Sequence, residues 1–360
     1  MALSALLGQP RATTLLGGAL ASGRVHHAYL FAGPPGVGKS LAARLLAQAL
    51  NCESPAALEA ARRGAFVDEP CGTCGSCRHI SEEAKKHGHP LVLWVDTEAA
   101  MQAAGLYAPE GDRVAAKAIG VRLLRELVIP RLALKALGGR RKVAIVRDVD
   151  FTEGAQNAFL KTLEEPPPDT TFMLLSSTPD ALKPTIRSRC LRVTFQPLPR
   201  ELVAERIAKA RGISHQEAEL CAALAGGSLG LALEIDPKTL AQRREWIVAF
   251  SRLGEGDHAG WLGLAEALGE KATAIEALEL FETWLHDVAL YAGAQVAPAV
   301  NVDLAEEAKA LAIRLGIRET LRRLELVKRA RSAVDGNAQP RLQLERTFLA
   351  FCGIAPLTVG

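Results

Sequence analysis

The stretch HHAYLFAGPPGVGKSLAARLLAQAL, residues 26–50, decides the fold of the first half of the chain. Residues 26–33 form an apolar run that predicts a buried strand, and residues 40–50 have the spacing of an amphipathic helix. A Gly-x4-Gly-Lys-Ser loop between a strand and a helix turns its backbone N–H groups toward phosphates. Lys39 can then reach the β- and γ-phosphates, and Ser40 can offer its hydroxyl to magnesium. The sequence therefore predicts a nucleotide site made of Gly33, Pro34, Pro35, Gly36, Val37, Gly38, Lys39 and Ser40.

The pattern of strand and helix repeats beyond this loop. Further apolar runs typical of strands lie at 91–96, 142–146, 171–177 and 191–196, with helical stretches between them. Such alternation predicts a parallel α/β domain. The prolines of 197–199 end this pattern, and the remainder of the chain has helical character. We expect an α/β P-loop domain at 1–196, a small helical domain at 197–238 and an all-helical domain at 239–360. Residues 60–70 and 97–117 carry no cap signals, so we expect mobile insertions there.

Composition limits the class of protein. The 360 residues are 49% hydrophobic and 23% charged, and the formal net charge is only +3. A charge this small gives no overall field that favours nucleic acid, so any basic surface must be local. No uninterrupted apolar run reaches the roughly 18 residues of a membrane span. We therefore expect a soluble cytoplasmic protein of two or three domains with no membrane contact.

Hydrolysis of a bound nucleotide needs acids after a second apolar strand: one to hold magnesium and usually one to orient water. That strand is KVAIV, 142–146, and Arg147 directly follows it. Asp148 is then in the water-orienting position, while a cation at 147 opposes magnesium. The alternative is that Asp150 replaces the missing acid through a shifted register. The sequence predicts binding of ATP with Mg²⁺ but impaired hydrolysis.

Three cysteines within seven residues, Cys71, Cys74 and Cys77, lie in the glycine-rich stretch CGTCGSC. This spacing allows a tight turn to direct several thiolates at one ion, and a structural zinc site needs four ligands. Cys52, separated from Cys71 by 18 residues, is the candidate fourth ligand, and His79 is its rival. A disulfide framework is disfavoured in a reducing compartment. We expect a closed structural Zn²⁺ module at 52–77.

Three segments carry a specific resemblance to a known family. NAFLKTLEEPPPDTTFMLLSSTPDALKPTIRSRCLRVTF, 157–195, resembles the clamp-loader branch of the AAA+ ATPases, above all in its LKTLEEPP and SRC motifs. The phosphate loop with a cysteine module after its helix is similar to the bacterial DNA polymerase III clamp loader. NAQPRLQLERTFL, 337–349, resembles the signature of that family's helical collar. The resemblance implies an AAA+ domain, a helical lid and a collar used for oligomerisation.

Departures from the motor pattern indicate the type of subunit. The gamma/tau motor has acids after its second strand, where this chain has Arg147, and an arginine that senses the γ-phosphate, where this chain has Gly230. The sequence Gly-Ser-Leu-Gly-Leu-Ala at 227–232 resembles the delta-prime stator. The competing interpretations are an active gamma/tau-type ATPase and, from another class, a zinc-bearing nucleic-acid-binding module.

The resemblance also implies roles for single residues. Arg189 would be an arginine finger that acts in trans on the nucleotide of a neighbouring motor subunit. Thr178, together with Ser177, matches the first-sensor position near the γ-phosphate, although helix capping is an equally simple role. The partners implied are the gamma/tau and delta subunits in a hetero-oligomeric ring, with the sliding clamp and primer-template DNA reached through the complex.

Overall fold

The structure is a computed structural model that describes residues 3–81, 89–103, 105–106, 118–133, 140–147, 151–254, 260–293 and 299–353. Contacts within the chain separate two units. The first comprises 1–199 with 227–230, and the second comprises 200–226 with 231–360. The predicted division into three domains stays a prediction. Among the described residues, no helix combines the length and apolar character that crossing a bilayer requires.

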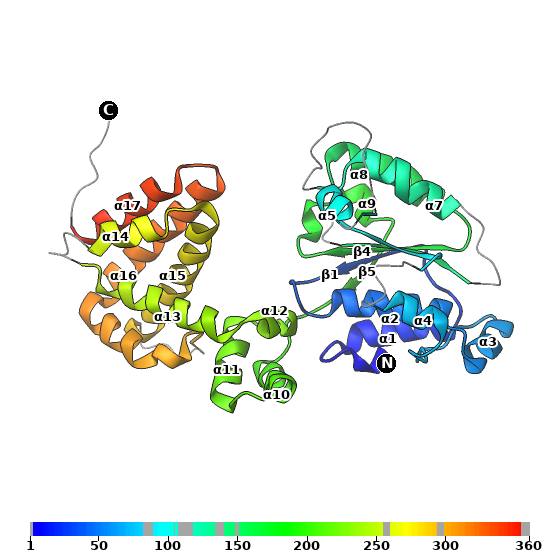
Figure 1. The fold of residues 1–360 in the computed structure, drawn as a ribbon, viewed down its shortest axis with the longest axis horizontal. Coiled ribbons are helices and arrows are strands. Elements are labelled where there is room, and N and C mark those ends of the chain that lie inside the picture. The colour runs from blue at the N-terminus through cyan, green and yellow to red at the C-terminus, as the bar shows by residue number, and fades with distance from the viewer. Residues whose placement is uncertain are drawn as a thin grey trace. The chain divides into compact units, whose positions relative to one another are not determined.

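A five-stranded parallel sheet forms the centre of the first unit (Figure 1). Its strands are β1 (Ala28–Ala32), β2 (Val92–Val95), β3 (Lys142–Val146), β4 (Thr170–Ser176) and β5 (Leu191–Thr194). Their order across the sheet is β2-β3-β4-β1-β5. Each of the five apolar runs in the sequence overlaps one strand, so the predicted α/β class is confirmed.

Helices cover both faces of this sheet, as the continuous apolar strands require. They are α1 (Pro10–Ala21), α2 (Lys39–Asn51), α4 (Gly75–Ile80), α5 (Glu98–Ala103), α6 (Val121–Leu123), α7 (Ile129–Ala133), α8 (Glu153–Glu164) and α9 (Pro184–Arg187). Helix α3 (Pro55–Arg62) instead packs through Ala57 against Cys52 and Cys77. In β1, Phe31 packs into the cluster that includes Leu16 of α1 and Leu46 of α2. Its neighbour Leu30 packs into the opposite cluster, which includes Phe159 of α8. Figure 1 shows α1, α2 and α4 on one side of the sheet and α8 and α9 on the other.

The stretches 60–70 and 97–117, expected to be mobile insertions, both contain helical residues, and their mobility stays a prediction. Helix α3 occupies Pro55–Arg62, with the Ser54 hydroxyl accepting from the N–H of Ala57. After it, Phe66 donates its backbone N–H to Leu20 and packs against the core. Helix α5 lies inside the second stretch. The Ser-Pro pair before α3 is a helix-start signal that sequence reasoning overlooked.

The second unit is helical throughout its described residues. Its helices are α10 (Arg200–Arg211), α11 (His215–Leu224), α13 (Pro237–Arg252), α14 (Gly260–Ala267), α15 (Lys271–Ala292), α16 (Ala305–Asp335) and α17 (Pro340–Phe351), and α12 (Leu229–Glu234) begins in the first unit. Aromatic rings fill its core: Phe250 and Phe281 stack with centroids 4.0 Å apart. Asn337, in the predicted collar signature, has a φ of 68° between α16 and α17, a conformation that asparagine tolerates well.

Candidate nucleotide site and cysteine cluster

Glycines shape the phosphate loop between β1 and α2. A Cβ at position 33 would lie 2.3 Å from the carbonyl oxygen of Phe195, so only glycine fits beside the end of β5. Gly38 caps the start of α2 with a φ of 103°, which L side chains rarely adopt. The N-terminus of a 13-residue helix therefore opens directly onto the loop. A helix start of this kind attracts anions through its unpaired N–H groups and its dipole.

Lys39 is buried, with 6% of its surface exposed. Its Nζ donates to the carbonyl oxygens of Gly33 and Pro34, each 2.5 Å away. A cavity of about 250 Å³ lies beside the loop. The predicted site residues that line it are Pro35, Gly36, Gly38, Lys39 and Ser40. The other three predicted residues do not line the cavity. Gly33 and Pro34 bind Lys39 through their carbonyl oxygens, and the Val37 side chain is buried in the core.

Arg147 lines the same cavity, directly after β3. Two residues at the end of the neighbouring strand β2 contact its guanidinium. Asp96 forms an ion pair with it at 3.1 Å, and the Trp94 ring centroid lies 5.3 Å from the Arg147 Cζ. Asp96 also accepts a hydrogen bond from the N–H of Thr97. The Asp96 carboxylate is thus close to the position where a metal-holding acid would be expected, but it is paired with the Arg147 guanidinium.

Two predicted nucleotide contacts are not placed in this cavity. Asp148 lies outside the described residues. Thr178 follows β4, is exposed, and makes no side-chain cap to the short 3-10 helix Pro179–Ala181 that it precedes. Its backbone N–H donates to the Ser176 hydroxyl at 3.1 Å. The first-sensor role of Thr178 therefore stays a prediction.

Gly230 lies against the phosphate loop. Its N–H donates to the carbonyl oxygen of Gly36 at 3.0 Å. A Cβ built at position 230 would be 3.0 Å from the Gly36 Cα, which is tighter than most Cβ contacts in proteins. The loop and the segment 227–230 thus meet through backbone atoms, and a larger residue at 230 would require the loop to move by a few tenths of an ångström.

Arg189 follows the short helix α9. One of its terminal nitrogens lies 2.8 Å from a carboxylate oxygen of Glu164 at the end of α8, and the other donates to the carbonyl of Thr185 at 3.0 Å. About a third of the side chain is exposed. Arg189 does not line the cavity at this chain's own phosphate loop.

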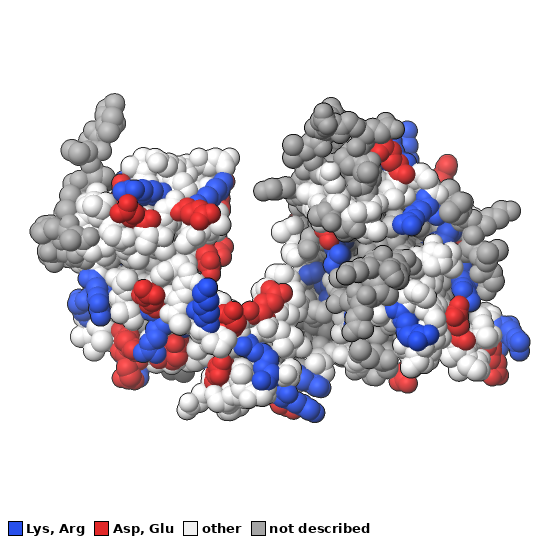
Figure 2. Space-filling model, in the orientation of Figure 1, with Lys and Arg blue, Asp and Glu red and all other residues white. Residues whose placement is uncertain are grey.

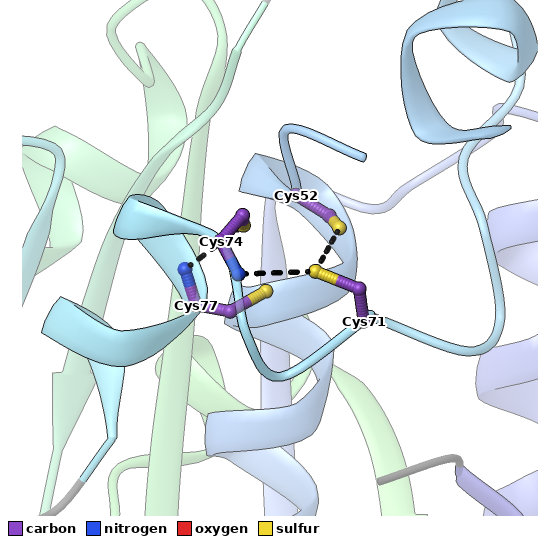
Figure 3. A group of neighbouring side chains, drawn as sticks. All are labelled: Cys52, Cys71, Cys74 and Cys77. Carbon is purple, nitrogen blue, oxygen red and sulfur yellow. Dashed lines mark hydrogen bonds between the residues drawn. The ribbon is translucent and has the colours of Figure 1, made fainter. Parts of the chain in front are cut away.

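The four predicted metal ligands come together in space. Figure 3 shows Cys52 at the end of α2, Cys71 and Cys74 on the turn that leads into α4, and Cys77 in the first turn of α4, with the sulfur atoms of Cys52, Cys71 and Cys77 pointing toward one another. All four sulfur atoms, including that of Cys74, lie within 4.8 Å of one another. Tetrahedral zinc thiolates need S···S separations of about 3.8 Å, so the group has the size that zinc requires. His79 is not in this group, and its Nδ1 lies 2.7 Å from the carbonyl oxygen of Gly75.

The surroundings of the sulfurs also favour a cation. Burial raises the pKa of Cys71, but N–H groups of Cys74 and Thr73 outweigh it and lower that pKa to about 6. Burial and the neighbouring thiols raise the pKa of Cys77. Thiolates packed this closely repel one another, and a divalent cation would relieve that repulsion. The donor set fits Zn²⁺, and its closed geometry would leave no open position for catalysis.

The family model described as DNA polymerase III, delta subunit matches residues 8–199, more than half of the chain. This chain belongs to that family. It is 32% identical over 283 residues to DNA polymerase III subunit tau of Escherichia coli, which covers 75% of this chain and 39% of that protein. It is 32% identical over 200 residues to DNA polymerase III subunit delta' of Bacillus subtilis, covering 55% and 51%. The chain therefore spans less than two thirds of the length of these relatives.

Among solved structures, a DNA polymerase III gamma subunit-related protein of Thermotoga maritima covers 95% of this chain and 99% of its own, with 18% identity and a TM-score of 0.46. By sequence, the relatives of this chain include both tau and delta' subunits. Sequence reasoning missed Trp94 and Asp96 around Arg147. It placed Glu164 and Arg189 in two motifs of one segment but did not pair them, because a contact between separate motifs is not visible in local pattern.

Proposed function

We propose that this chain is a delta-prime-type subunit of a clamp loader. It packs in a ring with gamma/tau and delta subunits, and the ring loads a sliding clamp onto primer-template DNA. The chain holds a nucleotide at its phosphate loop with little turnover of its own. It gives Arg189 to the nucleotide site of a gamma/tau neighbour.

The observation that carries this proposal is Arg147. A magnesium-dependent ATPase needs a carboxylate near the end of this strand to hold the ion. Here a guanidinium lines the cavity instead, and Asp96 is engaged by it at 3.1 Å. Position 230, where a sensing arginine would be expected, carries a glycine whose N–H is bonded to the Gly36 carbonyl, so no side chain there can contact the γ-phosphate. Both departures reduce hydrolysis without removing the loop that binds phosphates.

Arg189 suits a role in trans. Its guanidinium lies outside the chain's own nucleotide cavity and is partly exposed, so a neighbouring subunit can reach it. Arginine fingers supplied in trans stabilise the charge that develops on the transferred phosphoryl group, and they increase rates by about 10³–10⁵-fold.

Zinc has a structural role in this proposal. Cys52, Cys71, Cys74 and Cys77 would hold one Zn²⁺ and fix the turn before α4 onto the end of α2. On the face drawn in Figure 2, the described lysines and arginines are interspersed with acids. The described residues drawn there therefore form no uniformly basic surface of the kind that a zinc-bearing nucleic-acid-binding module would use.

Two measurements test the proposal. The purified full chain should turn over ATP at a rate near the uncatalysed background. In a loader reconstituted with gamma/tau and delta, Arg189→Ala should abolish hydrolysis at the single site that it serves, whereas Arg187→Ala, which breaks an exposed pair with Asp180, should not. DNA-stimulated ATPase equal in the Arg189→Ala and wild-type loaders would remove the finger role.

The second candidate is a gamma/tau-type ATPase. It is favoured by the complete phosphate loop and by the gamma/tau relatives, of which that of Mycobacterium tuberculosis is 30% identical and covers 94% of this chain and 59% of its own length. Fast ATP turnover by the lone chain would establish this candidate and overturn the stator.

A further inference from the structure

The nucleotide cavity contains two cations and, among the described residues that line it, no acid. Lys39 comes from the start of α2 and Arg147 from the end of β3. In a P-loop site that uses magnesium, one negative side chain after this strand helps to bind the ion. The charge of the described lining is therefore opposite to what a divalent cation requires.

Arg147 is held in place rather than free to move out. Its guanidinium is fixed by Asp96 at 3.1 Å and lies over the ring of Trp94, and less than a third of its side chain is exposed. Its Nε is buried and has no hydrogen-bond partner among the described residues. A buried donor without an acceptor costs free energy that an anionic oxygen in the cavity would recover. The Arg147 guanidinium is thus fixed in the cavity, and its Nε–H is available to donate to an anionic oxygen.

Magnesium does not fit this donor set. Mg²⁺ prefers oxygen ligands in an octahedron and usually takes one or two carboxylates from the protein. Of the described lining residues, Ser40 is the one with a hydroxyl for the ion, and the nearby carboxylate of Asp96 is already paired with Arg147 and with the N–H of Thr97. A guanidinium, by contrast, matches phosphate oxygens in geometry and charge.

We propose that Arg147 replaces the metal ion at this site, so that the chain binds the metal-free polyphosphate of a nucleoside di- or triphosphate. Lys39 and Arg147 together neutralise the phosphates that Lys39 and Mg²⁺ share in an active P-loop enzyme. This inference rests on the proposed function, because it gives the nucleotide of the stator a structural and not a hydrolytic role. A metal-free polyphosphate carries more negative charge than its magnesium complex, so chelation of magnesium should strengthen binding or leave it unchanged.

The test is a titration of the full chain with a fluorescent ATP analogue, in excess EDTA and in excess MgCl₂. Wild type should bind at least as tightly in EDTA as in magnesium. Arg147→Met, which keeps an apolar contact with Trp94, should weaken binding in EDTA by about tenfold or more, the loss expected for hydrogen bonds to a charged group. Arg147→Asp should weaken it further in EDTA and recover part of it in magnesium.

Arg122→Met is the matched control, since it removes an arginine paired with Glu126 outside the cavity and should bind as wild type does. Thermal unfolding of each variant shows whether it folds. Binding by wild type only in magnesium would overturn the inference, and so would absence of binding in both buffers. Binding only in magnesium would leave the proposed function intact. Absence of binding would remove the nucleotide from that proposal but not the finger role, which is tested separately by Arg189→Ala in the reconstituted loader.

Discussion

Replacing Glu164 by glutamine removes the charge that holds Arg189 within its own chain. The two side chains are 35% and 49% exposed, and their oxygen and nitrogen lie 2.8 Å apart. Ion pairs this exposed contribute about 0.2–1 kcal/mol. Because an arginine that serves a neighbour must first leave Glu164, the pair lowers the population of the available finger by a factor of about 1.4 to 5. Glu164→Gln should therefore leave the ATPase of a reconstituted loader unchanged or raise it up to about fivefold, and lower the free energy of unfolding by at most about 1 kcal/mol.

The assay is DNA-stimulated ATPase at limiting DNA, where engagement of the finger has most effect on the rate. Glu165→Gln is the control, because the exposed neighbouring carboxylate lies at the C-cap of α8 and is not the partner of Arg189. A fall in rate similar to that of Arg189→Ala would refute the reasoning. It would mean that Glu164 orients Arg189 toward the neighbour's nucleotide and does not compete with that nucleotide for the guanidinium.

Three further outcomes are expected. Cys74→Ser should lower zinc from about one to well below one ion per chain by atomic absorption, while Cys190→Ser, outside the cysteine cluster, keeps it. Burial, with a smaller effect of nearby Arg140, lowers the pKa of His89 to about 4. Because His89 is neutral in the folded chain, its contribution to stability is complete above about pH 6.5 and is lost as the pH falls. Between about pH 7 and 5, the free energy of unfolding in urea should therefore fall by about 2 kcal/mol more for wild type than for His89→Gln. Phe281→Ala should cost about 3–5 kcal/mol by the same method, because the ring is fully buried, whereas Leu321→Ala, half exposed, should cost less than about 0.5 kcal/mol. Equal losses within either pair of variants would contradict the burial that the structure assigns to His89 or Phe281.

Much of the first unit could be predicted from local pattern alone. Its strands are continuous apolar runs because both faces of a parallel sheet are buried, and such runs are visible in sequence. The phosphate loop is likewise local, since its glycines and Lys39 act within eight residues of one another. The cysteine group was predictable because three of its members share one turn.

The rest depends on contacts that join distant segments. Nothing in the neighbourhood of Arg147 indicates that Asp96, fifty-one positions earlier, would neutralise it, and that pairing follows from β2 lying beside β3. Gly230 meets Gly36 only because the chain returns to the first unit after α11. Helix α3 was overlooked for a different reason: it is only eight residues long, and its start signal is the pair Ser54-Pro55.

Helix α2 begins at the phosphate loop and ends at a cysteine of the cluster. Cys52 is its C-cap residue, and Gln48 on its last turn donates to the carbonyl of Cys77 at 2.8 Å. A helix of this length spans about 20 Å, so the cysteine cluster anchors the end of α2 that lies opposite the phosphate loop. Oxidation of the thiols, or loss of the Zn²⁺ that we propose they bind, would remove this anchor and allow α2 to fray from its C-terminal end. Amide hydrogen exchange along α2 should then be faster after the thiols are oxidised than while they are reduced.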